Sequence, residues 1–318
     1  MSVPLLRNAR TPLAVLVAAL VSVTACTSSP PDRQATPATS SGATASSALT
    51  PSPGGESQSG GDGSRGGCVV AAAGDVAGAD DYRKGAAKTA ELITAAKPKA
   101  VLALGDLAYD EGTAAEFADV YDPTWGKFKD ITYPTPGNHE YESHGKGYFD
   151  YFDVDPNYAV DVCGWHVVSV DQYAGMKEAV AFIEKEGAAA GGAPLLVFWH
   201  EARFSSGSEH GSNPDLQPLW AAAVDAGARI VLSAHDHDYE RFEPMDANGE
   251  QRADGTVAFV AGTGGHHLKK LGHHQPFSAE ATDGTPGVLF LSLRRDGYDW
   301  TYEDVKGNTD DSGSQRVP

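Results

Sequence analysis

The sequence predicts an α/β fold in which two sheets pack against each other and helices cover their outer faces. Stretches of strand and helix character alternate along the chain from residue 68 onward. A polar residue of a type that binds metals repeatedly follows an apolar strand. Toward the end of the chain, strands outnumber helices, which favours a sandwich of two sheets. Because the carboxyl ends of parallel strands lie along one edge, we expect the polar residues to converge there.

The stretch Val101–Tyr109, VLALGDLAY, is the centre of this pattern. Its four apolar residues are typical of a buried parallel strand, and Asp106 follows at the carboxyl end. An aspartate in this position, taken alone, would merely cap the next helix. Ligand-type residues at the ends of other predicted strands favour a different role, in which the carboxylate bridges two metal ions.

The remaining elements follow from apolar runs and from the spacing of apolar residues. The predicted helices are residues 83–97, 114–129, 176–186 and 216–226. The predicted strands are residues 68–73, 101–104, 131–133, 158–162, 165–170, 194–199, 229–233, 256–260, 287–293 and 298–303.

The first 26 residues resemble a bacterial export signal. Arg7 and Arg10 precede a short apolar run, Leu13–Val23, which is too brief to span a bilayer. The run leads into Val-Thr-Ala-Cys, which is similar to the lipobox of bacterial lipoproteins and implies lipid attachment at Cys26. The alternative is an ordinary signal peptide with a chance cysteine. Either way, we expect an exported protein, lipid-anchored at the cell membrane or extracellular.

Residues 27–67 are rich in Ser, Thr, Pro, Gly and Ala, so they are predicted to form a disordered linker. Residues 308–318 are predicted to be a disordered tail, which leaves 68–307 as the folded domain. In an exported domain, Cys68 and Cys163 are candidates for a disulfide, although two separate buried thiols are the alternative.

The charge balance argues against a polyanionic partner. The chain has 24 Lys and Arg residues against 43 Asp and Glu residues, and its formal net charge is −19. Such an excess of acid disfavours binding to nucleic acid or directly to an anionic membrane surface. We therefore expect contact with a membrane only through a lipid anchor. Attraction of a phosphate substrate would have to come from bound cations and local histidines.

Five short motifs follow one another in the predicted domain: GDVAG, GDLAY, GNHE, WH and AHDH. In this order they resemble the motifs of the calcineurin-like metallophosphoesterases, and the tyrosine in GDLAY makes them most similar to the purple acid phosphatase branch. The resemblance implies a four-layer α/β/β/α sandwich of two mixed sheets flanked by helices. It departs from the family in Ala234, where glycine is usual.

The resemblance also implies two metal ions that share the Asp106 carboxylate. One would be bound by Asp75, Asp106, Tyr109 and His237. The other would be bound by Asp106, Asn138, His200 and His235. A phenolate with two carboxylates suits Fe(3+), whereas two imidazoles and an amide oxygen suit divalent Fe, Zn or Mn. For Tyr109, the alternative is core packing.

Two further histidines have expected roles at the substrate. His139 is expected to bind the phosphate or protonate the leaving group, and the alternative is a packing role. His210 lies in a Gly/Ser-rich loop and is expected to act as general acid, although a solvated loop histidine is the alternative. With Asn138, these two residues form the predicted substrate contacts. The pairs His266-His267 and His273-His274 are predicted to lie in an exposed loop rather than to bind a further metal.

These features predict a hydrolase for small phosphate monoesters, in which a metal-bound hydroxide attacks phosphorus directly. A phosphodiesterase or nucleotide hydrolase using the same site is the first alternative. The second is a metal-binding surface lipoprotein without catalytic activity.

Overall fold

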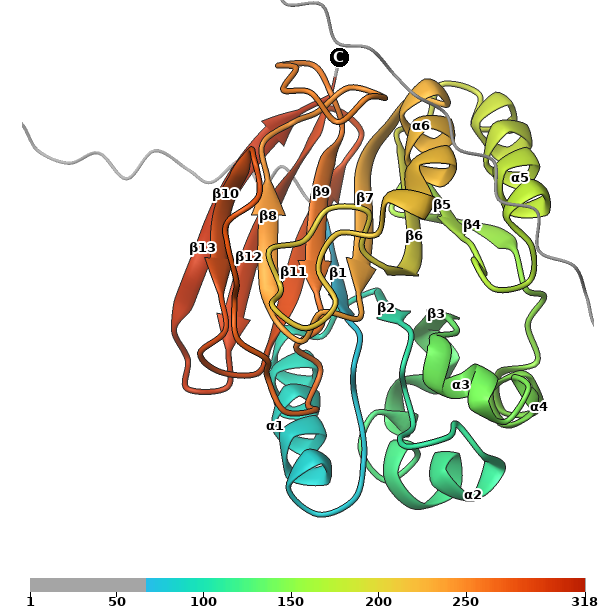
Figure 1. The fold of residues 1–318 in the computed structure, drawn as a ribbon, viewed down its shortest axis with the longest axis vertical. Coiled ribbons are helices and arrows are strands. Elements are labelled where there is room, and N and C mark those ends of the chain that lie inside the picture. Colours follow the sequence, from blue (N-terminus) through green and yellow to red (C-terminus); the bar gives the residue numbers. More distant parts are fainter. Residues whose placement is uncertain (1–66, 318) are drawn as a thin grey trace, which may run out of the picture. The chain divides into compact units, whose positions relative to one another are not determined.

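The computed structural model describes residues 67–317, which form two mixed β-sheets packed face to face with helices outside them (Figure 1). The predicted signal segment, Cys26 and the linker up to residue 66 lie outside the described residues. The four-layer α/β/β/α arrangement implied by the motifs is confirmed.

The first sheet combines three parallel strands with three antiparallel ones. Strands β1, β2 and β3 run parallel, and β11, β12 and β13 continue the sheet from the other side of β1 in antiparallel pairs. In spatial order the strands are β13 (Thr309–Arg316), β12 (Gly297–Asp304), β11 (Gly287–Arg294), β1 (Cys68–Ala73), β2 (Ala100–Leu104) and β3 (Thr132–Thr135).

The second sheet has a parallel centre formed by β5, β6, β7 and β9, with antiparallel strands at both edges. In spatial order the strands are β10 (Ser278–Thr282), β8 (Tyr239–Phe242), β9 (Val257–Ala261), β7 (Ala228–Ala234), β6 (Leu195–Glu201), β5 (Trp165–Ser169) and β4 (Tyr158–Val162).

Helix α1 covers the outer face of the first sheet, and α5 and α6 cover that of the second (Figure 1). The α-helices are α1 (Asp81–Ala96), α2 (Ala114–Glu116), α3 (Asn138–Glu142), α4 (Lys146–Phe152), α5 (Met176–Ala189) and α6 (Gln217–Asp225). Single turns of other helix types are η1 (Phe117–Tyr121), η2 (Gly126–Ile131) and η3 (Pro214–Leu216). Within residues 67–317, no helix combines the length and apolarity needed to cross a bilayer.

The alternation of side chains along the strands produces the layers. In β2, Leu102 and Leu104 point into the core between the sheets, whereas Val101 and Ala103 pack under α1. Because both faces of the central strands are buried, their sequences read as unbroken apolar runs. The apolar runs that precede Asp75, Asp106 and His235 are therefore strands covered on both sides.

The predicted helix 114–129 is wrong as a continuous element. It divides into α2, the π turn η1 and the 3-10 turn η2, with a break around Pro123. Proline has no backbone N–H, so it cannot continue the helical hydrogen-bond ladder.

The prediction that residues 308–318 are disordered is also wrong. Thr309–Arg316 form β13, which pairs with β12 along its whole length. The segment contains no large apolar residue, but the backbone hydrogen bonds of an edge strand do not require one. The domain therefore extends at least to residue 317.

Asp311 fastens β13 to both sheets. It is almost fully buried and accepts hydrogen bonds from the Tyr239 hydroxyl at 2.8 Å, from Arg241 Nε at 2.7 Å and from Trp300 Nε1 at 3.0 Å. Tyr239 and Arg241 belong to β8, and Trp300 belongs to β12.

A disulfide joins Cys68, at the start of β1, to Cys163, in the turn between β4 and β5, with the Cα atoms 5.7 Å apart. The predicted pairing is confirmed. It links the two sheets at the end of β1 that lies away from Asp75.

Replacement of Asp311 by Ala should lower the free energy of unfolding by about 3 kcal/mol, because it leaves the largely buried Arg241 guanidinium without its carboxylate. Urea unfolding monitored by tryptophan fluorescence measures this change. The exposed neighbour Asp310 provides the control, since Asp310→Ala should change stability by less than about 0.5 kcal/mol. Equal effects of the two substitutions would contradict the anchoring role.

Candidate metal centre

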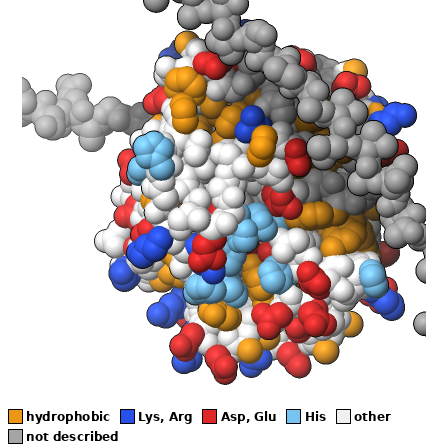
Figure 2. Space-filling model, in the orientation of Figure 1, with side chains coloured by type: hydrophobic (Ala, Val, Ile, Leu, Met, Phe, Trp, Pro, Cys, Tyr) orange, Lys and Arg blue, Asp and Glu red, His pale blue; other side chains and the backbone are white. Residues whose placement is uncertain are grey.

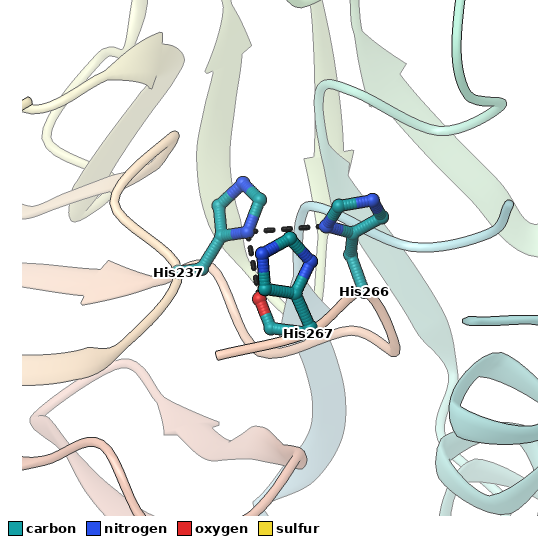
Figure 3. Close-up of side chains that lie close together, drawn as sticks. All are labelled: His237, His266 and His267. Carbon is teal, nitrogen blue, oxygen red and sulfur yellow. Dashed lines mark hydrogen bonds between the residues drawn. The ribbon is translucent and has the colours of Figure 1, made fainter. Parts of the chain in front are cut away.

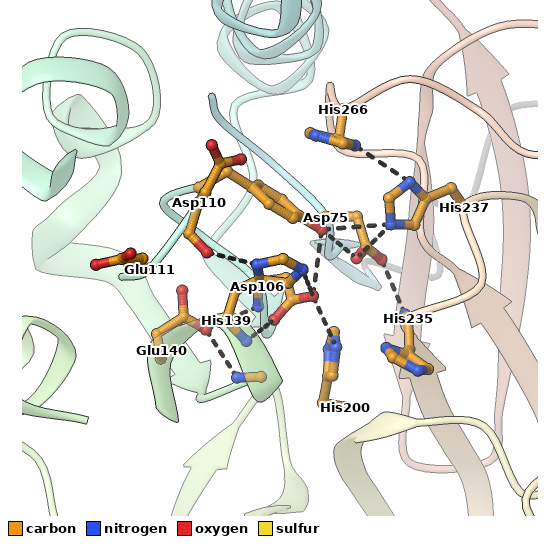
Figure 4. Close-up of polar contacts among 12 residues, drawn as sticks. Asp75, Asp106, Asp110, Glu111, His139, Glu140, His200, His235, His237 and His266 are labelled. Atoms are coloured by element: carbon orange, nitrogen blue, oxygen red, sulfur yellow. Dashed lines mark hydrogen bonds and ion pairs between the residues drawn. The ribbon is translucent and has the colours of Figure 1, made fainter. Parts of the chain in front are cut away.

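Five of the seven predicted metal ligands lie close together at one edge of the sandwich, at the carboxyl ends of strands from both sheets: Asp75, Asp106, His200, His235 and His237 (Figure 4). Asp75, Asp106 and Asn138 follow β1, β2 and β3, and Tyr109 lies three residues after Asp106. His200 lies near the end of β6, and the two histidines of AHDH follow β7. The predicted convergence of these residues is confirmed.

The first predicted ligand set surrounds the Tyr109 hydroxyl. This hydroxyl donates to Asp75 Oδ1 at 2.8 Å and to Asp106 Oδ2 at 3.2 Å, and it lies 3.3 Å from His237 Nε2. His237 Nε2 is itself 3.3 Å from Asp75 Oδ1. Four donor atoms thus face one point, and two of them are carboxylate oxygens.

The second predicted set shares Asp106 with the first. Asp106 Oδ2 is 3.2 Å from His200 Nε2, and ligand atoms of Asp106, His200 and His235 lie within 4.8 Å of one another. Asn138 Oδ1 and His235 Nδ1 are buried and have no hydrogen-bond partner within residues 67–317. Unsatisfied buried polar atoms are costly, and a cation bound among them would satisfy the amide oxygen. The donor set therefore fits a metal ion.

One oxygen of each central carboxylate is fixed by the backbone, and the other faces the ligands. Asp106 Oδ1 accepts from the His139 N–H, and Asp75 Oδ2 accepts from the His235 N–H, both at 2.9 Å. Asp106 Oδ2 is left between the Tyr109 hydroxyl and His200 Nε2, so this one atom belongs to both ligand sets. This position is the one required of a bridging ligand.

The rings of His200 and His237 are each oriented by a hydrogen bond at Nδ1. Nδ1 of His200 lies 2.7 Å from the Leu104 carbonyl oxygen, and Nδ1 of His237 lies 2.9 Å from that of His267. A carbonyl can only accept, so each Nδ1 carries the proton in these bonds. Nε2 is then directed at the centre, an arrangement common among metal-binding histidines.

The ionisable groups of the centre perturb one another strongly. Burial raises the pKa of Asp75 and of Asp106, but the neighbouring imidazoles outweigh it and hold both pKa values below the usual range. Burial lowers the pKa of His200, but the Asp106 carboxylate dominates and raises it to about 10. Burial and the two carboxylates raise the pKa of Tyr109 well above its usual value. The pair of carboxylates therefore attracts positive charge to the centre.

The local backbone is adapted to bring these groups together. Asp75, Asp106 and His235 have positive φ angles of 56°, 51° and 70°, a left-handed conformation that is uncommon for residues other than glycine and is often found at functional sites. A Cβ atom on Gly137 would lie 2.1 Å from Asp106 Oδ1, so only glycine allows this approach.

Ala234, where the related motifs carry glycine, is accommodated from the opposite side. A Cβ atom on Gly74 would lie 2.5 Å from the Ala234 Cβ atom. The missing side chain at Gly74 thus makes room for the methyl group of Ala234, and the ligand positions that follow are unaffected.

His139 and His210 flank the centre without belonging to either ligand set. His139 Nδ1 contacts the Asp110 carbonyl oxygen at 2.5 Å, which directs Nε2 toward Asp106 Oδ2, 3.9 Å away. The His139 side chain is 33% exposed, so a substrate can reach it. His210 is exposed, and its ring centroid lies 4.0 Å from that of His235.

Glu140 holds the central turn in place, although sequence reasoning gave it no role. Its buried carboxylate accepts hydrogen bonds from the backbone N–H groups of Asp106 at 2.9 Å, Leu107 at 2.8 Å, Ala108 at 3.2 Å and Gly137 at 2.8 Å. The turn after β2 is therefore clamped to the turn after β3. The sequence feature that could have indicated this role is the glutamate within GNHE, which lies next to the predicted ligands.

His266 lies in the centre, and its predicted exposure is wrong. Its ring stacks on Tyr109 with centroids 4.0 Å apart, and its Nδ1 lies 3.2 Å from Nδ1 of His237 (Figure 3). Backbone N–H groups of the loop fasten it to the turn after β1, with His266 N donating to the Asp75 carbonyl oxygen at 2.9 Å. His267, His273 and His274 are exposed, as predicted. The Nδ1 atom of His237 already contacts the His267 carbonyl oxygen. We therefore infer that His266 and His267 orient the His237 ring.

Replacement of Glu140 by Ala should leave four buried N–H groups without their acceptor, at a cost of about 3 kcal/mol in the free energy of unfolding. Loss of such a support should also weaken metal affinity by about tenfold to a hundredfold. Urea unfolding and the metal content after dialysis measure both effects. Glu142→Ala, at an exposed position, is the control and should behave as wild type. Wild-type metal retention in Glu140→Ala would contradict the clamp.

Comparisons with known proteins agree with this architecture. The chain is similar in structure to the purple acid phosphatase PPD1 from yellow lupin (Lupinus luteus), with a TM-score of 0.63, 18% identity, and coverage of 78% of this chain and 53% of the lupin chain. It thus spans about half of that phosphatase. It is also similar to GAP50, the anchor in the inner membrane complex of Plasmodium, with a TM-score of 0.64, 15% identity, and coverage of 79% and 90%.

A third similar structure is a dimetal phosphatase from Danio rerio, with a TM-score of 0.55, 9% identity, and coverage of 79% and 99%. No curated protein matches the chain in sequence. The family model for calcineurin-like phosphoesterases matches residues 69–239, more than half of the chain and all seven predicted ligands. The chain therefore belongs to the calcineurin-like phosphoesterase family.

Proposed function

We propose that this protein is a binuclear-metal-dependent hydrolase of phosphate monoesters. The observation that carries the proposal is the position of Asp106 Oδ2, which lies within 3.2 Å of both the Tyr109 hydroxyl and His200 Nε2. When bound, two cations would polarise the phosphoryl oxygens and activate a water molecule for in-line attack.

The chain's own residues supply the remaining functions. His139 Nε2 lies 3.9 Å from Asp106 Oδ2, within reach of a phosphate bound at the centre, and the Asn138 amide, which follows β3 at the same edge, would donate to the phosphate through Nδ2. His139 keeps Nε2 directed at the centre through its contact with the Asp110 carbonyl, so it is ready to bind a phosphate oxygen. The exposed His210 stands beside His235, on the side of the second ligand set, where it can reach a leaving group.

The fold is also compatible with a role that requires no catalysis, since GAP50 is described as an anchor and shares the architecture. Two observations favour the enzyme. All seven ligand positions are filled and convergent, and His139 and His210 flank them. A surface protein that only binds metal would have no need of the two flanking histidines.

The metal-loaded protein should hydrolyse p-nitrophenyl phosphate faster than bis-p-nitrophenyl phosphate, and a chelator should abolish both activities until metal is restored. Release of p-nitrophenol measures the rates. Preference for the diester would favour the phosphodiesterase alternative. Turnover of neither ester after reconstitution would refute the proposed enzyme and favour a metal-binding surface protein.

We further propose that the first ligand set binds Fe(3+) and the second a divalent Fe, Zn or Mn ion. The tyrosine and two carboxylates of the first set are hard, anionic ligands, and the second set is richer in imidazole. Elemental analysis of the purified protein gives the metal pair.

Iron-loaded protein should show a visible charge-transfer band from a ferric phenolate, and Tyr109→Phe should abolish the band. The visible spectrum, recorded together with metal content, measures this. Tyr121→Phe, which alters a buried phenol outside the ligand set, should keep the band. A colourless, fully active protein loaded with zinc or manganese would show that Tyr109 is not needed as an iron ligand.

Replacement of His210 by Ala should slow alkyl phosphates about a hundredfold and aryl phosphates far less, because only a poor leaving group requires protonation as it departs. The ratio of kcat for an alkyl and an aryl ester measures the effect. The exposed His273→Ala is the control. Equal losses on both esters would remove the general-acid role of His210.

We also propose that the protein is exported and attached to a membrane through lipid on Cys26. The support is the sequence around this residue. Cys26→Ser should move the protein from the membrane fraction to the soluble fraction. Unchanged partition would exclude lipid attachment at Cys26.

A further inference from the structure

A cavity of about 600 Å³ adjoins the metal centre on the side of α1. It lies between the first turns of α1, the loop that carries His266, and the segments that precede β11 and follow β12. Three lysines, Lys84, Lys88 and Lys306, line the cavity together with the carboxylates of Asp81 and Asp283.

A column of stacked rings connects this cavity to the centre. The ring of Tyr82, in the cavity wall, lies 3.9 Å from that of His266, and His266 lies 4.0 Å from Tyr109. The Tyr109 hydroxyl belongs to the first ligand set. His266 lines the cavity, and its ring lies one stacking distance from that of Tyr109, so a ligand that reaches both the cavity and the metal centre must be longer than a single phosphate.

The carboxylates at the cavity do not cancel its lysines. Asp81 forms an exposed ion pair with Lys84 at 2.6 Å, which is a weak interaction in water. Asp283 is engaged by the Leu271 N–H at 2.9 Å and by Lys270 at 3.2 Å, and Lys270 does not line the cavity.

The other two lysines are available to an anion. Among the described residues, the acceptor of Lys306 Nζ is the neutral Thr285 Oγ1, at 2.7 Å. Among residues 67–317, Lys88 forms no ion pair. Within residues 67–317, neither of these ammonium groups forms an ion pair, and both border a cavity in a chain whose net charge is −19.

The opposite side of the centre has the reverse charge. Asp110, Glu111 and Glu116 lie there, on the α2 side and next to His139, and the backbone N–H groups of residues 110 and 111 donate to Glu116. Figure 2 shows histidine side chains gathered on this face, with several Asp and Glu side chains below and to their right and side chains of both charges to their left. An anionic group that projects from the centre is therefore attracted toward α1 and repelled from α2.

We propose that this cavity binds a second phosphate group of the substrate, so that the preferred substrates are phosphate esters carrying another phosphate on the leaving side. The proposal rests on the proposed function of the metal centre. Lysine ammonium groups suit a dianionic phosphate, and the ring column sets the separation between the two phosphates. The metal centre would bind the phosphate that is cleaved, and the lysines would bind the one that leaves with the alcohol.

The matched pair glucose 6-phosphate and glucose 1,6-bisphosphate tests this, because the two differ only in the second phosphate. The metal-loaded protein should show a higher kcat/KM for the bisphosphate. In the variant Lys84→Gln/Lys88→Gln/Lys306→Gln, the ratio of bisphosphate to monophosphate kcat/KM should fall about tenfold, which corresponds to about 1.4 kcal/mol.

The control variant Lys99→Gln/Lys127→Gln/Lys177→Gln removes the same charge at exposed positions outside the cavity and should keep the wild-type ratio. A ratio that is unchanged in the cavity variant, or that falls equally in both variants, overturns the proposal.

Failure of the proposed function would be visible separately, as the absence of any p-nitrophenyl phosphate hydrolysis. In that case no turnover occurs, and calorimetric titration with the two sugar phosphates tests whether the cavity binds the second phosphate. Tighter binding of the bisphosphate by wild-type protein than by the cavity variant supports it. Equal binding by the two proteins overturns it.

Discussion

The bridging position of one carboxylate oxygen is the constraint on which the site depends. Asp106 Oδ2 can serve two ligand sets only because Oδ1 is held by a backbone N–H group and because the whole turn is clamped by Glu140. The clamp is a buried acid whose pKa is raised to about 7, first by burial and then by Asp106. Burying the Glu140 carboxylate costs free energy, and the hydrogen bonds that it accepts position the Asp106 carboxylate.

The two-sheet architecture explains why the ligands come from such distant parts of the sequence. Each sheet contributes parallel strands that end at the same edge, one supplying the aspartates and the asparagine and the other the histidines. Neither sheet alone could surround two cations. The core between the sheets, to which Leu104 and Leu232 contribute, therefore fixes the distance between carboxylates and imidazoles.

Much of the centre was predictable because its chemistry is local in sequence. GDLAY and GNHE place a ligand directly after a strand, and parallel strands bring such ligands together without further information. The structure of residues 309–316 was not predictable in this way. β13 is held by backbone pairing and by Asp311, whose partners Tyr239 and Trp300 are distant in sequence. The burial of His266 was not predictable for the same reason, since only the tertiary fold brings Tyr109 and Tyr82 to its two faces.

Strand β1 separates the start of the described chain from the metal ligands. The described chain enters the domain at Gly67 and Cys68, and β1 runs six residues before the turn that carries Asp75. At about 3.3 Å per residue, the point of entry and the catalytic edge are separated by the length of the strand, about 20 Å. The first described residues therefore lie at the end of β1 opposite the metal ligands.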